Sequence, residues 1–172
     1  VSSYNESDAV LTRNYSVTTT GFNTKMDEQE SKPVGHATED IGWIAIESGG
    51  SVGSGILAGT TGDVVTHGAT AVSFGSAFAG TPVFVADMQT NDGSDPAVAM
   101  GIGGLNALGT SVFVREEQSN DAETNHTSEN VGYIALESGS YTTAGKINGS
   151  DVIRGGDGDD TIYADLSEDL MV

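Results

Sequence analysis

Apolar and polar residues alternate in four short windows of the chain, and this period-2 pattern predicts β-strands. The windows are VFVA (83–86, after Pro82), AVAMGI (97–102), SVFVRE (111–116) and VGYIALE (131–137). Turn-rich stretches such as TNDGSDP and SNDAETNHTS separate them. No window sustains a helical apolar stripe, and the connections are too short for helical crossovers. The pattern therefore predicts an all-β, antiparallel fold.

One phrase occurs twice in the chain. TEDIGWIAIESG (38–49) and SENVGYIALESG (128–139) align without a gap at an offset of 90 residues. The same offset carries His36 onto His126, and Glu is found three residues after each histidine. Agreement over this length is too extensive for chance in a Gly- and Thr-rich chain, so it indicates an internal repeat.

The repeat extends towards the N-terminus in shorter matches. NESDAV resembles DGSDPAV, and DEQES resembles EEQSN, whereas the opening section of the second copy (71–87) has no counterpart in the first. We therefore expect the chain to begin inside a first, truncated copy. The predicted domains are residues 1–50 (C-terminal part of that copy), 51–139 (a complete sandwich) and 140–172 (a linker and a different module).

The charge of the chain restricts its partners. The 172 residues include 25 acidic and 6 basic side chains, for a net charge of −19. Nucleic acid and anionic membrane surfaces are excluded as expected partners because the acidic field repels them. A divalent cation is a natural partner, although acidity can also serve solubility or reflect a salty habitat. There is no cysteine, no apolar run near the roughly 20 residues of a membrane span, and no visible signal peptide.

The C-terminal module carries a glycine-rich nonapeptide. GGDGDDTIY (155–163) fits the pattern G-G-x-G-x-D-x-U-x at every specified position. Its glycines allow tight turns that point carbonyls at a cation, and Asp supplies the hard oxygen that Ca²⁺ prefers. The nine residues on either side are degraded repeats that keep Asp151 and Asp169. An EF-hand is rejected because Ile162 occupies the position that requires Gly.

This tail resembles the repeats-in-toxin family of calcium-binding β-rolls. The resemblance implies a short parallel β-roll, Ca²⁺ as cofactor, and export from a bacterium by a one-step machine that removes no N-terminal signal. A disordered acidic tail is the alternative. The metal-binding candidates are Asp151, Gly155, Gly156, Gly158, Asp160 and Asp169.

The second copy resembles an H-type lectin domain over residues 72–139. SFGSAFAGTPVFVA (an aromatic-anchored strand, then the Pro-Val strand) carries the resemblance, together with a last strand in which an aromatic residue precedes Ile-Ala. That aromatic residue is Tyr133 in the second copy and Trp43 in the first. The resemblance implies a six-stranded antiparallel β-sandwich that forms a homotrimer and binds a hexose or N-acetylhexosamine at the protomer boundaries.

The family's sugar contacts come from an Asp in an early loop, an Arg opening the middle strand, and a His and an aromatic residue near the last strand. Asp95, His126 and Tyr133 match three of these roles, but AVAMGI has no Arg, and Arg115 lies in a later strand. The carbohydrate-binding candidates are Asp95, His126, Tyr133, Arg115, His36 and Trp43. The alternatives are a core role for the aromatic residues, a solvated His126, and a Glu129 that fastens a loop to backbone amides.

The sequence does not indicate an enzyme. It has neither G-x-S-x-G nor H-E-x-x-H, and the adjacent Glu116 and Glu117 point to opposite faces of a strand. We expect a secreted, extracellular carbohydrate-binding module joined to a calcium-binding roll, as part of a larger bacterial adhesin or exoprotein. The alternatives are a structural spacer of a surface protein, or an accessory domain of an extracellular hydrolase, without sugar binding.

Overall fold

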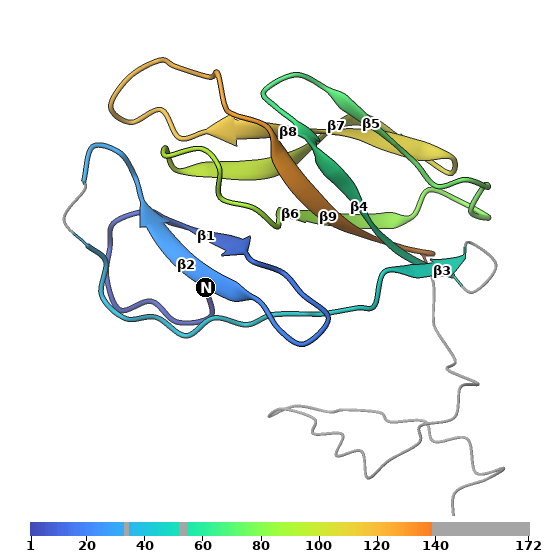
Figure 1. The fold of residues 1–172 in the computed structure, drawn as a ribbon, viewed down its shortest axis with the longest axis horizontal. Coiled ribbons are helices and arrows are strands. Elements are labelled where there is room, and N and C mark those ends of the chain that lie inside the picture. Colours follow the sequence, from blue (N-terminus) through green and yellow to red (C-terminus); the bar gives the residue numbers. More distant parts are fainter. Residues whose placement is uncertain (33–34, 52–54, 139–172) are drawn as a thin grey trace, which may run out of the picture. The chain divides into compact units, whose positions relative to one another are not determined.

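The computed structural model describes residues 1–32, 35–51 and 55–138. Val1–Ser138 form one compact unit. The described residues contain nine β-strands and no helix, and all strand pairs are antiparallel, which confirms the predicted all-β class (Figure 1). No helix in this part of the chain is long and apolar enough to cross a membrane. The predicted linker and calcium roll, including Asp151, Asp160 and Asp169, lie outside the described residues.

Two sheets form an open sandwich from the second copy. The larger sheet has the order β3 (Gly49–Ser51), β4 (Ile56–Val65), β9 (Glu129–Leu136) and β6 (Val83–Met88). The smaller sheet has the order β5 (Thr70–Ser73), β8 (Gly109–Glu116) and β7 (Ala97–Asn106). The repeated phrase of the second copy thus forms β9, a central strand with a neighbour on both sides.

The core lies between the inward faces of these sheets. Val112 and Val114 of β8, and Val131 and Ala135 of β9, are completely buried. Their spacing of two or four residues follows from the side-chain alternation of a strand. Val131 and Ala135 thus lie on the face of β9 that packs against the core.

The aromatic-anchored strand expected at the start of SFGSAFAGTPVFVA is wrong. β5 ends at Ser73, and Phe74 and Phe78 lie in the following loop, where Gly75 has a φ of 75°. Glycine adopts this left-handed conformation without the steric cost of a Cβ atom. Both phenylalanines nevertheless enter the core and contact each other edge to face, with ring centroids 5.4 Å apart.

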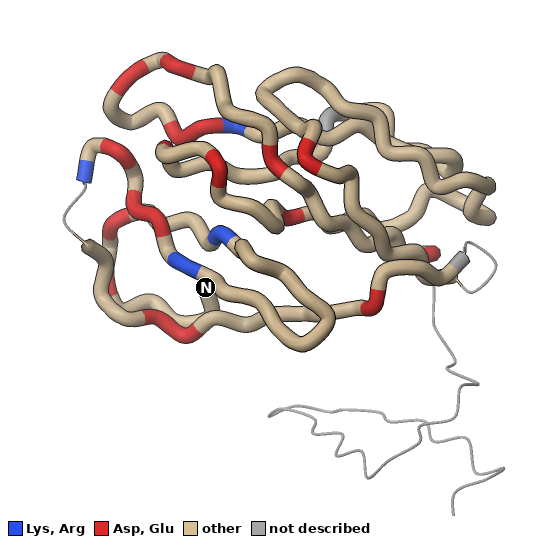
Figure 2. The backbone as a smooth tube through the Cα atoms, viewed as in Figure 1, with Lys and Arg blue, Asp and Glu red and all other residues tan. Residues whose placement is uncertain are grey.

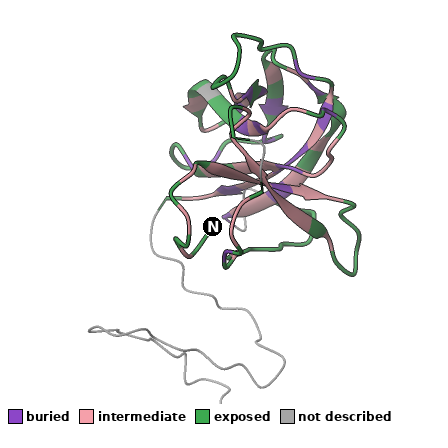
Figure 3. Ribbon diagram, turned by 90° about the vertical axis from the view of Figure 1, so that its left-hand side faces the viewer, coloured by how far each residue is buried: buried purple, intermediate pink, exposed green. Residues whose placement is uncertain are grey.

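The first copy contributes only half of such a sandwich. Its hairpin consists of β1 (Val10–Tyr15) and β2 (Asn23–Glu28), which correspond to β7 and β8. Residues 38–48 correspond to β9 and run beside the hairpin, but they are not assigned as a strand (Figure 1). The described residues of this copy contain no counterparts of β4, β5 and β6, and fewer of its residues are buried (Figure 3).

Candidate functional site

The second copy contains a buried polar cluster around Glu129, at the start of β9. Its carboxylate accepts hydrogen bonds from the backbone amides of Asp92 and Gly93, both at 3.0 Å, and from the Thr90 hydroxyl. Thr90 in turn accepts a hydrogen bond of 2.8 Å from the amide of Asn130. Glu129 therefore fastens the loop between β6 and β7 to the first residues of β9, as one interpretation of the sequence predicted.

His126 is the buried member of this cluster and lies between two carboxylates. Its Nδ1 lies 2.8 Å from Glu116 and its Nε2 lies 3.0 Å from Glu129, and its side chain is fully buried. Burial alone would lower the pKa of His126, but the two carboxylates outweigh burial and raise it. The interpretation of His126 as a solvated loop residue is wrong. A sugar hydroxyl could reach either ring nitrogen only by displacing a carboxylate.

Arg13 brings a cation into the cluster from the first copy. It lies on β1 and is fully buried, with one guanidinium nitrogen 2.8 Å from Glu129. The other donates to the backbone carbonyls of Gly93 (3.2 Å) and Asp95 (3.0 Å). Burial would raise the pKa of Glu129, but the hydrogen bonds and the charge of Arg13 lower it to about 2. Thr90, Glu116, His126, Glu129 and Arg13 are called the Glu129 cluster below.

The first copy repeats this arrangement at Glu39. Ser3 Oγ donates to Glu39 at 2.5 Å, and the amide of Asn5 donates at 2.7 Å. Ser3 also accepts from the amide of Asp40 at 2.6 Å, as Thr90 does from Asn130. The hydrogen bond from Ser3 contributes most to lowering the pKa of Glu39. Ser3, Asn5, His36 and Glu39 are called the Glu39 cluster.

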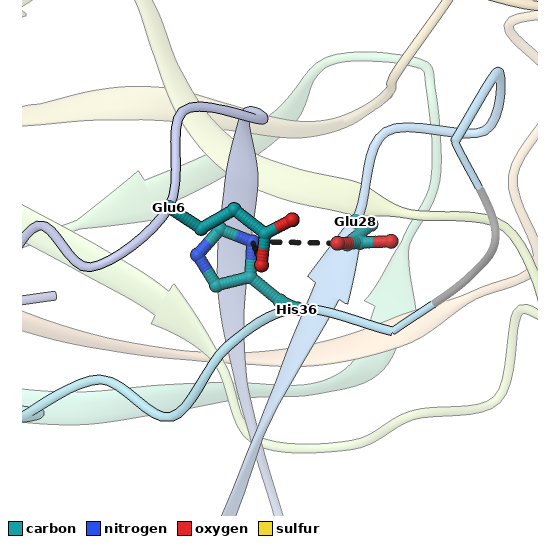
Figure 4. Close-up of side chains that lie close together, drawn as sticks. All are labelled: Glu6, Glu28 and His36. Carbon is teal, nitrogen blue, oxygen red and sulfur yellow. Dashed lines mark ion pairs between the residues drawn. The ribbon is translucent and has the colours of Figure 1, made fainter.

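The two clusters differ at the other nitrogen of the histidine. His36 Nε2 lies 3.3 Å from Glu39, but its Nδ1 has no hydrogen-bond partner. Nδ1 faces Glu28 at 3.4 Å and Glu6 at 3.9 Å (Figure 4). One ligand atom from each of Glu6, Glu28 and His36 lies within 4.8 Å of the others, so these three residues could hold a metal ion.

An acidic cleft of about 450 Å³ adjoins His36 and Glu28. Four further carboxylates line it, at Asp27, Glu30, Asp95 and Asp121. Figure 2 shows acidic segments gathered where the β2 end and the loop after β8 meet. Loss of hydration raises the pKa of Glu30, and the neighbouring Asp121 and Asp95 raise it further. The cleft therefore favours a cation over an anion or a neutral ligand.

A larger groove, of about 1150 Å³, is lined by residues of β1, of the segment 41–46 and of β9. Trp43 and Tyr133, two of the predicted sugar contacts, both line it, and Phe22 packs edge to face on Trp43 at 5.7 Å. Polar groups beside them include Asn14 and Asp87, which share a hydrogen bond of 2.7 Å.

The predicted sugar-binding residues do not lie together in this structure. Trp43 and Tyr133 share the groove, whereas Asp95 and His36 line the acidic cleft. His126 is in the interior, and Arg115 is exposed, 3.5 Å from Gln118.

Sequence reasoning did not assign a role to four residues of the polar clusters. They are Glu6, Arg13, Glu28 and Glu116. A signal was present for two of them, because Glu28 and Glu116 each end a strand that precedes a His-x-x-Glu motif. Nothing in the local sequence around Arg13 indicates its partner, which lies 116 residues further along the chain.

Comparison with known proteins gives one match. The chain is 35% identical over 149 residues to halomucin from the archaeon Haloquadratum walsbyi, which corresponds to 84% of this chain and 2% of halomucin. No family model matches the chain, and no solved structure matches it. At a coarse level the match is compatible with a domain of a surface or extracellular protein. Halomucin comes from an archaeon, whereas the sequence led us to expect a bacterial protein.

Proposed function

We propose that the chain is a non-enzymatic repeat segment of a large extracellular surface protein, in which neighbouring repeats complete each other's sandwiches. Three features support this proposal. The chain contains an internal repeat, it is similar to a segment amounting to 2% of halomucin, and its net charge of −19 keeps an exposed protein hydrated. A buried arginine of one copy also neutralises the Glu129 cluster of the next.

The observation that carries the proposal is that residues 41–46 are unpaired and exposed. They have the sequence of the central strand β9, yet no described strand pairs with them. Trp43, Ile44 and Ile46 are 68%, 79% and 43% exposed. Exposed apolar residues on an unpaired strand-like segment form a template for a further strand.

The partner with the right chemistry is a β4–β6 region of another repeat. In the second copy, β4 and β6 flank β9 and leave Tyr133 and Ile134 only partly exposed. The register is already set in the first copy, because the Ser2 amide donates to the Asp40 carbonyl as the Gln89 amide does to Asn130. A preceding repeat would place its counterpart of Val85 opposite Ile44, as Val85 lies opposite Ile134.

A fusion protein that carries a duplicate of residues 49–87 directly before Val1 tests the proposal. Urea unfolding should show a larger m value and a higher midpoint, because more surface becomes buried on folding. The matched control carries Asp in place of Phe74 and Phe78 in the added copy only, where both should enter the new core. Equal m values for the fusion, its control and the parent chain would contradict strand sharing.

Carbohydrate binding is the second candidate function. The aromatic faces of Trp43 and Tyr133 lie in one groove with amide and carboxylate groups, which suits the C–H and hydroxyl surfaces of a hexose or N-acetylhexosamine. A glycan array followed by titration of Trp43→Ala and Tyr133→Ala tests it. Binding lost in both variants would support a glycan site in the groove, and no binding by the folded chain would contradict it.

Calcium binding by the C-terminal repeats is a separate part of the proposal. It rests on the nonapeptide at 155–163, which lies outside the described residues. Calcium titration of the full chain should show binding that Asp160→Asn weakens, because this change removes one charged oxygen ligand. An unchanged titration would contradict a calcium roll in this chain.

A further inference from the structure

His36 has a buried ring nitrogen that the protein leaves without a hydrogen bond. Its side chain is 4% exposed, and Nδ1 has no hydrogen-bond partner. Buried polar atoms in folded proteins almost always have a partner, so an orphaned one needs an explanation. Among the described residues that could approach it, Glu28 and Glu6 face this nitrogen.

The contact made by Nε2, the other ring nitrogen, determines whether Nδ1 can act as an acceptor or ligand. Nε2 lies 3.3 Å from Glu39, and an ionised carboxylate can only accept a hydrogen bond. The hydrogen of this contact therefore lies on Nε2, and Nδ1 is the nitrogen left to accept or to bind a ligand. A lone pair on Nδ1 would face two carboxylates, which is repulsive unless a metal ion or a proton lies between them.

The two carboxylates are held in place by the backbone on either side of His36. The amide of Ala37 donates to Glu6 at 2.6 Å, and the amide of Gly35 donates to Glu28 at 3.0 Å. The 3.4 Å between His36 Nδ1 and Glu28 matches the ligand spacing of about 3.4 Å around a tetrahedral ion bound at about 2.1 Å. Glu6, at 3.9 Å from Nδ1, needs only a small movement.

We propose that Glu6, Glu28 and His36 bind one divalent transition-metal ion, for which Zn²⁺ is the representative probe. One imidazole nitrogen and two carboxylate oxygens suit zinc-type ions, whereas Ca²⁺ takes oxygen ligands alone. Glu39 is the outer carboxylate that orients a metal-bound histidine through its second nitrogen. The acidic cleft beside His36 and Glu28 attracts the cation.

The second copy provides an internal control without such a site. The residue that corresponds to Glu6 is Gly93, and a Cβ atom there would collide with the ring of His126. In the structure, the last residue of β8, Glu116, takes the place of Glu28, the last residue of β2, and it already bonds to Nδ1 of His126 at 2.8 Å. The second copy therefore has two ligand candidates in direct contact with each other and no room for an ion.

Calorimetric titration of the full chain with Zn²⁺ tests the site, in a millimolar background of Ca²⁺ that saturates oxygen-only sites. One site is expected, and Glu6→Gln should weaken it by roughly tenfold or more. This change keeps an oxygen to accept the Ala37 amide, so the fold is expected to persist. The matched control is Asp8→Asn, which changes a partly exposed carboxylate paired with Lys32 and should leave the affinity unchanged.

A proton on Nδ1 is the competing explanation. Nitrogen NMR of His36 separates the two without any substitution, because zinc must displace a proton from Nδ1 or occupy its lone pair. A His36 that stays doubly protonated in excess Zn²⁺ at neutral pH would overturn the proposal. Equal Zn²⁺ affinities of the parent chain, Glu6→Gln and Asp8→Asn would also overturn it.

Discussion

Both copies of the repeat use a glutamate to hold an upstream loop by hydrogen bonds, but the surroundings of that glutamate differ. In each, a glutamate three residues after a histidine accepts hydrogen bonds from a hydroxyl and from backbone amides of an upstream loop. The second copy closes this cluster with Arg13 and with strands on both sides of β9. Among the described residues, no arginine pairs with Glu39 and no strand is hydrogen-bonded to the segment that holds Trp43. The repeated segment (38–49 and 128–139) therefore determines the hydrogen bonds to the upstream loop. The strands next to this segment determine how far its apolar side chains are buried.

Removing Arg13 should have the largest effect, because it opens the closed cluster. Arg13→Ala leaves Glu129 buried with one cation fewer, and we expect it to lower the free energy of unfolding by about 3–5 kcal/mol. Urea denaturation measures this. Lys25→Ala, which breaks the partly exposed pair with Asp27 at 2.9 Å, should cost at most about 1 kcal/mol. Equal losses in both variants would show that the copies are not coupled through Arg13.

Truncating the equivalent aromatic residues should affect the two copies unequally. Tyr133 stacks on Phe84 with ring centroids 5.9 Å apart and packs against the core, so Tyr133→Ala should cost roughly 2–3 kcal/mol. Trp43 is 68% exposed, and Trp43→Ala should cost less than about 1 kcal/mol. Thermal unfolding of both variants gives the comparison. A larger loss at Trp43 would contradict the open state of the first copy.

Substitutions at the residues that face the two histidines, Gly93 beside His126 and Glu6 beside His36, should also affect the stability of the two copies differently. Gly93→Ala places a methyl group against the ring of His126, and the overpacking should cost about 1–3 kcal/mol. Glu6→Gly, the corresponding change in the first copy, removes a partly exposed side chain and should cost less than about 1 kcal/mol. Denaturant midpoints measure both changes. Tolerance of Gly93→Ala would indicate that His126 does not occupy the observed position.

The smallest effect is expected from pH between 5 and 8. The pKa of Glu129 falls from 4.5 to about 2 on folding, so its contribution is complete above about pH 5 and is lost as the pH falls below. The pKa of His126 rises from 6.5, so its contribution is complete below about pH 6 and is lost as the pH rises through the raised value. Stability should therefore be greatest near pH 5–6.

Urea midpoints measured from pH 4 to 9 test this profile. Glu116→Gln removes one of the two carboxylates that raise the pKa of His126, and it should flatten the alkaline side. A midpoint that rises steadily from pH 6 to 9 would contradict the assigned cluster.

Side-chain alternation predicted the fold class and most of the second copy from the sequence. The windows at 83–86, 97–102, 111–116 and 131–137 all lie largely within strands. β4 was not predicted, because Gly59 and Gly62 interrupt its apolar pattern and its pairing with β9 is irregular between Thr60 and Val65.

The candidate site was less predictable for a physical reason. The recurrence of His36 and His126 pointed to two special positions, but the chemistry at each depends on residues far away in the sequence. Glu116 pairs both with β7 and with His126, and Arg13 arrives from the other copy. These contacts form only once the sheets are assembled, so local patterns do not contain them.

Trp43, the single tryptophan of the chain, reports most directly on the proposal that repeats complete each other. The measurement is its fluorescence emission and acrylamide quenching in the parent chain and in the fusion that adds residues 49–87 before Val1. Strand sharing predicts a blue-shifted emission and reduced quenching in the fusion, but not in its Phe74→Asp, Phe78→Asp control. Identical emission and quenching in all three proteins would contradict it.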